Sequence, residues 1–142
     1  MNCFLDTSSL IKLYHFENES GEIIGYIKRN KINKIFLSVL AQVEFSSAFW
    51  KKVRMGEIEK NRCIEVIDCF ESDFKKFNWI EIDDEIIFNS KNLINTYGND
   101  GLRTLDSIQL STAIILRTNN CVNIVSDKLL KKIFQIEKLN LL

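Results

Sequence analysis

Four short apolar segments alternate with longer segments of helical periodicity, and this alternation limits the possible folds more than any other feature. The expected strands are residues 2–5, 34–37, 79–82 and 121–125. Between them, apolar residues recur every three or four positions, as on the buried face of an amphipathic helix. Strands that are joined by helices lie parallel, because a parallel connection needs a crossover of a dozen or more residues. The pattern therefore predicts an α/β fold with a mostly parallel sheet covered by helices on both faces.

Several expected helices follow a residue that can cap a helix. Ser38, Asp83 or Asp84, Thr104 and Asp127 can accept hydrogen bonds from the free N–H groups of a first turn. The expected helices span 10–14, 22–29, 39–54, 58–77, 84–97, 105–118 and 128–134, with a last edge strand at 139–141.

The composition suits one globular domain, residues 1–142, and excludes several classes of protein. The chain has 19 basic and 19 acidic residues, so its net charge is zero. Proteins that coat long nucleic acids are strongly basic, so that class is not expected. A small nuclease remains compatible with this charge, because bound metal ions can supply the positive charge.

Neither a membrane segment nor a zinc site is expected. No apolar run is long enough to span a membrane, and the N-terminal residues show no basic segment and no cleavage site of a signal peptide. We therefore expect a cytoplasmic protein. The cysteines form no CxxC pair and no cluster with histidine, which predicts reduced and mostly buried thiols.

Two aspartates directly follow expected strands. Asp6 ends the first strand and Asp127 follows the fourth. In parallel sheets, binding sites form outside the carboxyl ends of the strands, where the strand order reverses. If the first and fourth strands are neighbours at that point, the two carboxylates lie close together.

Two further acids interrupt the apolar faces of expected helices. Glu44 has Leu40 and Ala48 one turn away, and Asp106 has Leu110. An acid on a packed face costs free energy unless a cation or a metal ion meets it. For Asp106 a simpler interpretation is equally open, because the helix dipole favours an acid in a first turn.

Together the four acids predict a site for Mg²⁺ or Mn²⁺. Carboxylates that lie near one another repel, and no Lys or Arg is placed to pair with all of them. Oxygen ligands of this kind suit Mg²⁺ and Mn²⁺, and paired metal ions can stabilise the entering and leaving oxygens of phosphodiester hydrolysis.

The four acids lie in the segments Phe4–Tyr14, Ser38–Glu44, Leu102–Ala113 and Val125–Leu130. In this order the segments resemble the four motifs of PIN-domain ribonucleases, and the likeness is greatest to VapC-type toxins of toxin–antitoxin pairs. One such motif is weak, since a strand that ends in Asp is common. Four motifs in order along nearly the whole chain are fairly specific.

The resemblance implies a three-layer α/β/α sandwich, Mg²⁺- or Mn²⁺-dependent cleavage of RNA, and an inhibitory antitoxin encoded alongside. It also implies a homodimer, and the aromatic-rich expected helices favour such an assembly as well. Matched motif by motif, the metal-binding and catalytic acids would be Asp6, Glu44, Asp106 and Asp127. The hydroxyl of Thr7 or Ser8 would support these acids. Arg103 is close to Asp106 in the sequence, and for that reason we expect it to touch a substrate phosphate.

Two other functions remain open. In a phosphatase of the haloacid dehalogenase type, Asp6 would be the nucleophile, but that chemistry needs a second acid where Ser8 stands and a late pair of acids where only Asp127 is found. Alternatively, a PIN-like fold could be retained as a non-catalytic module that contacts RNA or protein. Metal titration discriminates, because such a module needs no ion.

Overall fold

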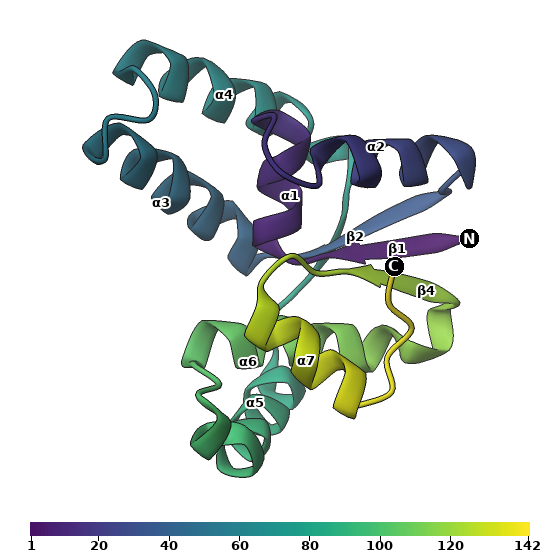
Figure 1. Cartoon of the computed structure of the whole chain (residues 1–142). Helices are drawn as coiled ribbons and strands as arrows, with labels where there is room; N and C mark the ends of the chain where they lie inside the picture. Colours follow the sequence, from purple (N-terminus) through teal and green to yellow (C-terminus); the bar gives the residue numbers. More distant parts are fainter.

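The structure, a computed structural model, describes all residues 1–142 and is built around a four-stranded parallel sheet (Figure 1). The strand order is β3-β2-β1-β4, with β1 (Asn2–Leu5), β2 (Lys34–Ser38), β3 (Asn78–Ile80) and β4 (Cys121–Ile124). Every neighbouring pair is parallel. The chain places β2 and β3 on one side of β1 and then returns to place β4 on the other side. The strand order therefore reverses between β1 and β4.

Helices cover both faces of the sheet, so the predicted three-layer α/β/α sandwich is confirmed. One face carries α1 (Thr7–Tyr14), α2 (Ser20–Arg29), α3 (Leu40–Arg54) and α4 (Lys60–Ser72). The other carries α5 (Asp84–Tyr97), α6 (Thr104–Ile115) and α7 (Lys128–Ile136). The alternation along β1 decides which core each side chain joins, because Cys3 and Leu5 pack toward the first face and Phe4 toward the second.

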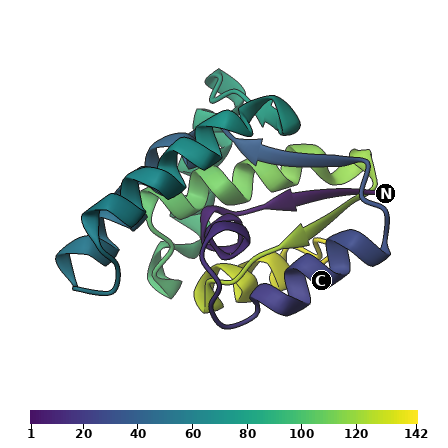
Figure 2. The same ribbon diagram turned by 90° about the horizontal axis from the view of Figure 1, so that it is seen from above.

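The α3 and α4 helices project beyond the carboxyl ends of the strands (Figures 1 and 2). Stacked and edge-to-face aromatic rings hold the two helices together, with Phe45 of α3 and Phe70 of α4 at a centroid distance of 4.1 Å. Helix α3 therefore borders the edge of the sheet at which the strands have their carboxyl ends.

Some predicted boundaries are wrong. The helix expected at 58–77 is α4, which ends at Ser72. A short 3₁₀ segment, η1 (Phe74–Lys76), follows it. The Trp79 indole donates to the Phe74 carbonyl at 3.0 Å, which turns the chain back into β3. The helix expected to reach 118 ends at Ile115 and continues as the 3₁₀ segment η3 (Leu116–Asn119).

The predicted helix caps are confirmed in part. Asp83 and Asp127 accept from the backbone N–H groups three residues on, at 2.9 and 2.8 Å. Thr104 is not a cap; it is the first residue of α6, which follows Arg103 without a side-chain cap. At the chain end, a single parallel bridge from Leu141 to Asn123 replaces the expected edge strand.

None of the helices combines the length and the apolar character that crossing a bilayer requires.

Candidate active site

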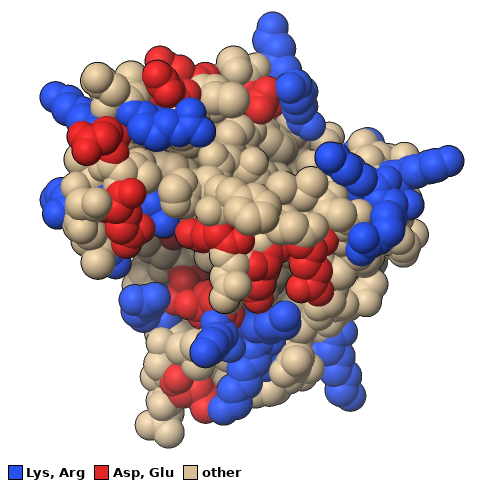
Figure 3. Space-filling view, turned by 45° about the horizontal axis from the view of Figure 1, so that its top comes forward, with Lys and Arg blue, Asp and Glu red and all other residues tan.

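A cleft of about 660 Å³ opens at the carboxyl end of the sheet, and all four predicted acids line it. Asp6 follows β1, Glu44 lies in α3, Asp106 is in the first turn of α6 and Asp127 follows β4. The register pairs Leu5 with Ile124 at the ends of β1 and β4, which brings the first and last acids to the same edge. Figure 3 shows acidic side chains inside a hollow of the surface, with Lys and Arg at its rim.

Asp6 is the most buried of the four, with 2% of its surface exposed. It caps α1, because its Oδ1 accepts from the Ser9 N–H at 2.9 Å, and the Ser8 hydroxyl donates to its other oxygen. This cap explains why α1 begins at Thr7, three residues earlier than expected. Burial raises the pKa of Asp6 to about 6, although the hydrogen bonds from Ser8 and Ser9 act in the opposite direction.

Glu44 is held by two side chains of other helices. The Thr7 hydroxyl donates to its Oε1 at 2.7 Å, and Gln109 Nε2 donates to the same oxygen at 2.8 Å. Gln109 Nε2 also donates to Thr7 Oγ1 at 3.0 Å, which closes a ring of three hydrogen bonds. Gln109 was not among the site residues predicted from the sequence. The only signal for it was its place three positions after Asp106, on the same side of the expected helix.

Asp106 lies beside Arg103, whose Nε donates to its Oδ2 at 3.3 Å. The pKa of Asp106 is raised chiefly by burial; Arg103 lowers it and the Asp127 carboxylate raises it. Arg103 was predicted to touch a phosphate. Because 79% of its side chain is exposed, its ion pair with Asp106 is weak, and its guanidinium remains accessible at the cleft.

Asp127 caps α7 through one oxygen and keeps the other free of hydrogen bonds. Its neighbour Ser126 pairs with Ser9 of α1, hydroxyl to hydroxyl, at 3.0 Å. This contact ties the loop after β4 to the first turn of α1, which Asp6 caps, and so fixes the Asp127 backbone relative to Asp6.

The family model for the PIN domain matches residues 3–133, which include all four acids. The chain belongs to the PIN-domain family. A comparison with curated proteins found no match.

Several solved structures share the fold at low sequence identity. VapBC2 from Rickettsia felis, bound to a DNA fragment from its promoter, is 16% identical with a TM-score of 0.65, and the alignment covers 100% of this chain and 98% of that one. VapBC-1 from nontypeable Haemophilus influenzae is 19% identical with a TM-score of 0.65, covering 100% and 97%. VapC20 from Mycobacterium tuberculosis, described as a toxin that cleaves the sarcin-ricin loop, is 10% identical with a TM-score of 0.66, covering 93% and 95%.

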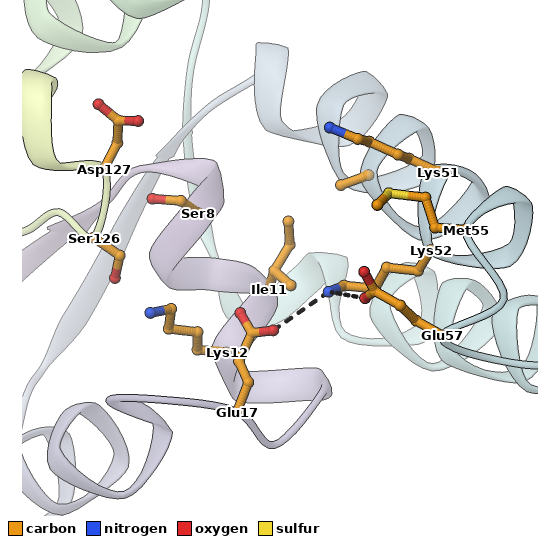
Figure 4. Close-up of a pocket in the computed structure, with 11 residues that line it drawn as sticks. Ser8, Ile11, Lys12, Glu17, Lys51, Lys52, Met55, Glu57, Ser126 and Asp127 are labelled. Atoms are coloured by element: carbon orange, nitrogen blue, oxygen red, sulfur yellow. Dashed lines mark hydrogen bonds and ion pairs between the residues drawn. The ribbon is translucent and has the colours of Figure 1, made fainter.

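Helix α3 of this PIN domain contributes two cationic side chains to the cleft. Lys51 and Arg54 line it, and neither makes an ion pair within the chain. Lys51 also lines a second cavity of about 430 Å³, which adjoins the cleft. Figure 4 shows Lys51 on the α3 side of this cavity, opposite Ser126 and Asp127.

The other lysines of the second cavity are already paired. Lys52 contacts Glu17 and Glu57 at 3.3 and 3.4 Å, as the dashed lines of Figure 4 show, and Lys12 contacts Glu19. Lys51 is therefore the one lysine in this cavity whose charge is free to meet an anion.

The donor set of the cleft fits a hard divalent cation, but its acids are not gathered around one point. They offer only carboxylate oxygens, which Mg²⁺ and Mn²⁺ prefer. One oxygen accepts no hydrogen bond in each of Glu44, Asp106 and Asp127. No three His, Cys, Asp or Glu side chains lie close enough to ligate one metal ion in this structure. Coordination by three of the acids therefore requires side-chain movement toward the centre of the cleft.

Proposed function

We propose that this PIN domain is a metal-dependent endoribonuclease, the toxin of a toxin–antitoxin pair, acting in the cytoplasm. The observation that carries the proposal is the shared cleft: four acids from four separate elements line it, and only Asp106 has a cationic partner. Membership of the PIN-domain family and the VapC-type neighbours support a nuclease. The choice of Mg²⁺ or Mn²⁺ rests on the oxygen-only donor set.

In this proposal Asp6, Glu44, Asp106 and Asp127 hold the metal. When bound, Mg²⁺ or Mn²⁺ would polarise a phosphodiester and lower the pKa of a water molecule near it. Asp6 is preset by its contacts to Ser8 and Ser9, since a carboxylate that already caps a helix loses little freedom on binding a ligand.

Beside the four acids, three cationic side chains of the cleft can contact RNA phosphates. They are Lys51, Arg54 and Arg103, and all line the cleft. Cationic side chains contact phosphates and so fix the position of the strand without reading its bases. The acids would otherwise repel the RNA, so these contacts offset part of that repulsion.

Cleavage of RNA by the purified protein tests this function. We expect structured RNA to be cut with Mg²⁺ or Mn²⁺ and to stay intact with EDTA. Hydrolysis of a small phosphate monoester without any cutting of RNA would instead favour the phosphatase reading. That reading is already weakened, because the residue two positions after Asp6 is Ser8, a hydroxyl that donates to Asp6. Binding of RNA with neither metal dependence nor cleavage would favour the non-catalytic module.

A cognate antitoxin and a homodimer are the partners we propose. The VapBC neighbours support an antitoxin partner. The aromatic rings on which the dimer was partly predicted are core: Phe45, Phe49 and Phe70 are buried in this chain. The homodimer therefore stays a prediction, which light scattering at high protein concentration decides.

Lys51→Ala is expected to weaken RNA binding several-fold and to reduce its dependence on salt. Loss of one phosphate contact lowers the slope of log affinity against log salt by about one. The measurement is fluorescence anisotropy of labelled RNA in EDTA, where cleavage does not interfere. Lys60→Ala is the control, because Lys60 is exposed at the start of α4, away from the cleft. Equal slopes for the two variants would contradict a role for Lys51 in RNA binding.

A further inference from the structure

The amide of Gln109 is a part of the cleft that the proposed reaction does not yet use. Only 3% of Gln109 is exposed, and it lies three residues after Asp106 on the same side of α6. Through the ring of hydrogen bonds it joins α6 to Thr7 of α1 and to Glu44 of α3. The same three helices carry parts of the cleft: α6 carries Asp106, α3 carries Glu44, and α1 begins directly after Asp6.

The orientation of this amide follows from its surroundings. With the amide reversed, its oxygen would face the Glu44 carboxylate, and two acceptors repel. Both N–H groups of Nε2 are therefore used, one by Glu44 and one by Thr7. The consequence is that Gln109 Oε1 is buried without a hydrogen-bond partner in the protein.

The arrangement carries a cost in stability. A buried oxygen without a partner costs free energy, and a leucine of similar size would avoid that cost. What the amide provides is a fixed Glu44 carboxylate. Two donors hold Oε1 of Glu44, while Oε2 accepts no hydrogen bond and is the oxygen that remains for a ligand in the cleft.

We propose that Gln109 is a positioning residue that holds Glu44 so that its free oxygen can bind a divalent cation, an inference that rests on the proposed function. Gln109 itself touches neither metal nor RNA in this account. It acts through Glu44, as partners of metal ligands do when they orient a ligand and set its affinity.

The test is metal binding by Gln109→Leu, which keeps the size of the side chain and removes both donors. The readouts are the Mn²⁺ dissociation constant from calorimetry and the melting temperature in EDTA. We expect the dissociation constant to rise about 10–100-fold, the range found when partners of metal ligands are replaced. The melting temperature in EDTA should be equal to that of the parent or higher, because the unpaired oxygen is gone.

Thr112→Val is the matched control. Thr112 is buried in the same helix and bonds to the Ile108 carbonyl at 2.8 Å, but it does not line the cleft. This variant loses a buried hydrogen bond of α6, so we expect a lower melting temperature in EDTA with the Mn²⁺ affinity of the parent.

Thr7→Val supplies a second measurement. Thr7 and Gln109 hold the same oxygen of Glu44, so their losses of Mn²⁺ affinity should not add in the double variant. Additive losses would mean that the two residues act independently, which contradicts a shared role.

Three further results would overturn the inference, and one of them concerns the function itself. If the parent binds Mn²⁺ and Gln109→Leu binds it equally well, the positioning role is wrong and the metal site stands. If Gln109→Leu in EDTA melts far below the parent, the amide serves the fold. If the parent binds no Mn²⁺ and cuts no RNA, the proposed function fails together with the inference.

Discussion

Asp6→Asn is expected to abolish RNA cleavage and to remove most of the increase in melting temperature that Mn²⁺ produces. Asp6 is the acid at the end of β1, buried at the floor of the cleft. The substitution removes a negative charge and a strong oxygen ligand but nearly keeps the shape. A ligand that binds only the folded state stabilises it by about 2.7 kcal/mol at one hundred times its dissociation constant. Most of that gain should be absent from the variant.

The matched control for Asp6→Asn is Asp68→Asn, because Asp68 is exposed on α4 and does not line the cleft. It should cut RNA and respond to Mn²⁺ as the parent does. In EDTA, Asp6→Asn should be at least as stable as the parent, because Asn can also cap α1. A variant that melts well below the parent in EDTA would show that Asp6 is chiefly a structural acceptor.

A second large effect is expected in the pH dependence of the unfolding free energy of the metal-free protein. Burial raises the pKa of Asp6 from 3.8 to about 6, so the folded state binds the proton more tightly than the unfolded state does. The stabilisation by this proton is complete below pH 4 and is lost as the pH rises through about 6. A shift of this size corresponds to about 3 kcal/mol of unfolding free energy.

Comparison with Asp6→Asn isolates this contribution from the other titrating groups. The measurement is urea unfolding in EDTA at a series of pH values between 4 and 7. Relative to the variant, the parent should become less stable across this range and then level off above about pH 6. A difference between the two proteins that does not change with pH would contradict the raised pKa of Asp6.

The acids at the strand ends could be predicted from the sequence because β-strand geometry leaves little freedom. A buried parallel strand that ends in Asp must place that side chain at the edge where sites form, and both Asp6 and Asp127 follow this rule. Glu44 and Asp106 were found because they interrupt apolar faces. Such an interruption indicates only that the acid has a partner. The structure shows that Thr7 and Gln109 are the partners of Glu44.

What the sequence could not reveal depends on contacts between distant segments. Gln109 looks like an ordinary helix residue until α6 is packed against α1 and α3, more than sixty positions away for Glu44. The end of α4 at Ser72 was missed for a similar reason. The apolar periodicity continues to Phe77, but the α-helix ends before Asp73, and the Trp79 indole holds the 3₁₀ turn that follows through the Phe74 carbonyl.

The central claim is that the four acids close around a divalent cation, and anomalous diffraction from a crystal soaked in Mn²⁺ tests it most directly. We predict an anomalous peak in the cleft, within bonding distance of Asp6 and of at least two of Glu44, Asp106 and Asp127. At saturating Mn²⁺, a cleft without such a peak, or a peak bound only outside the cleft, would contradict the account.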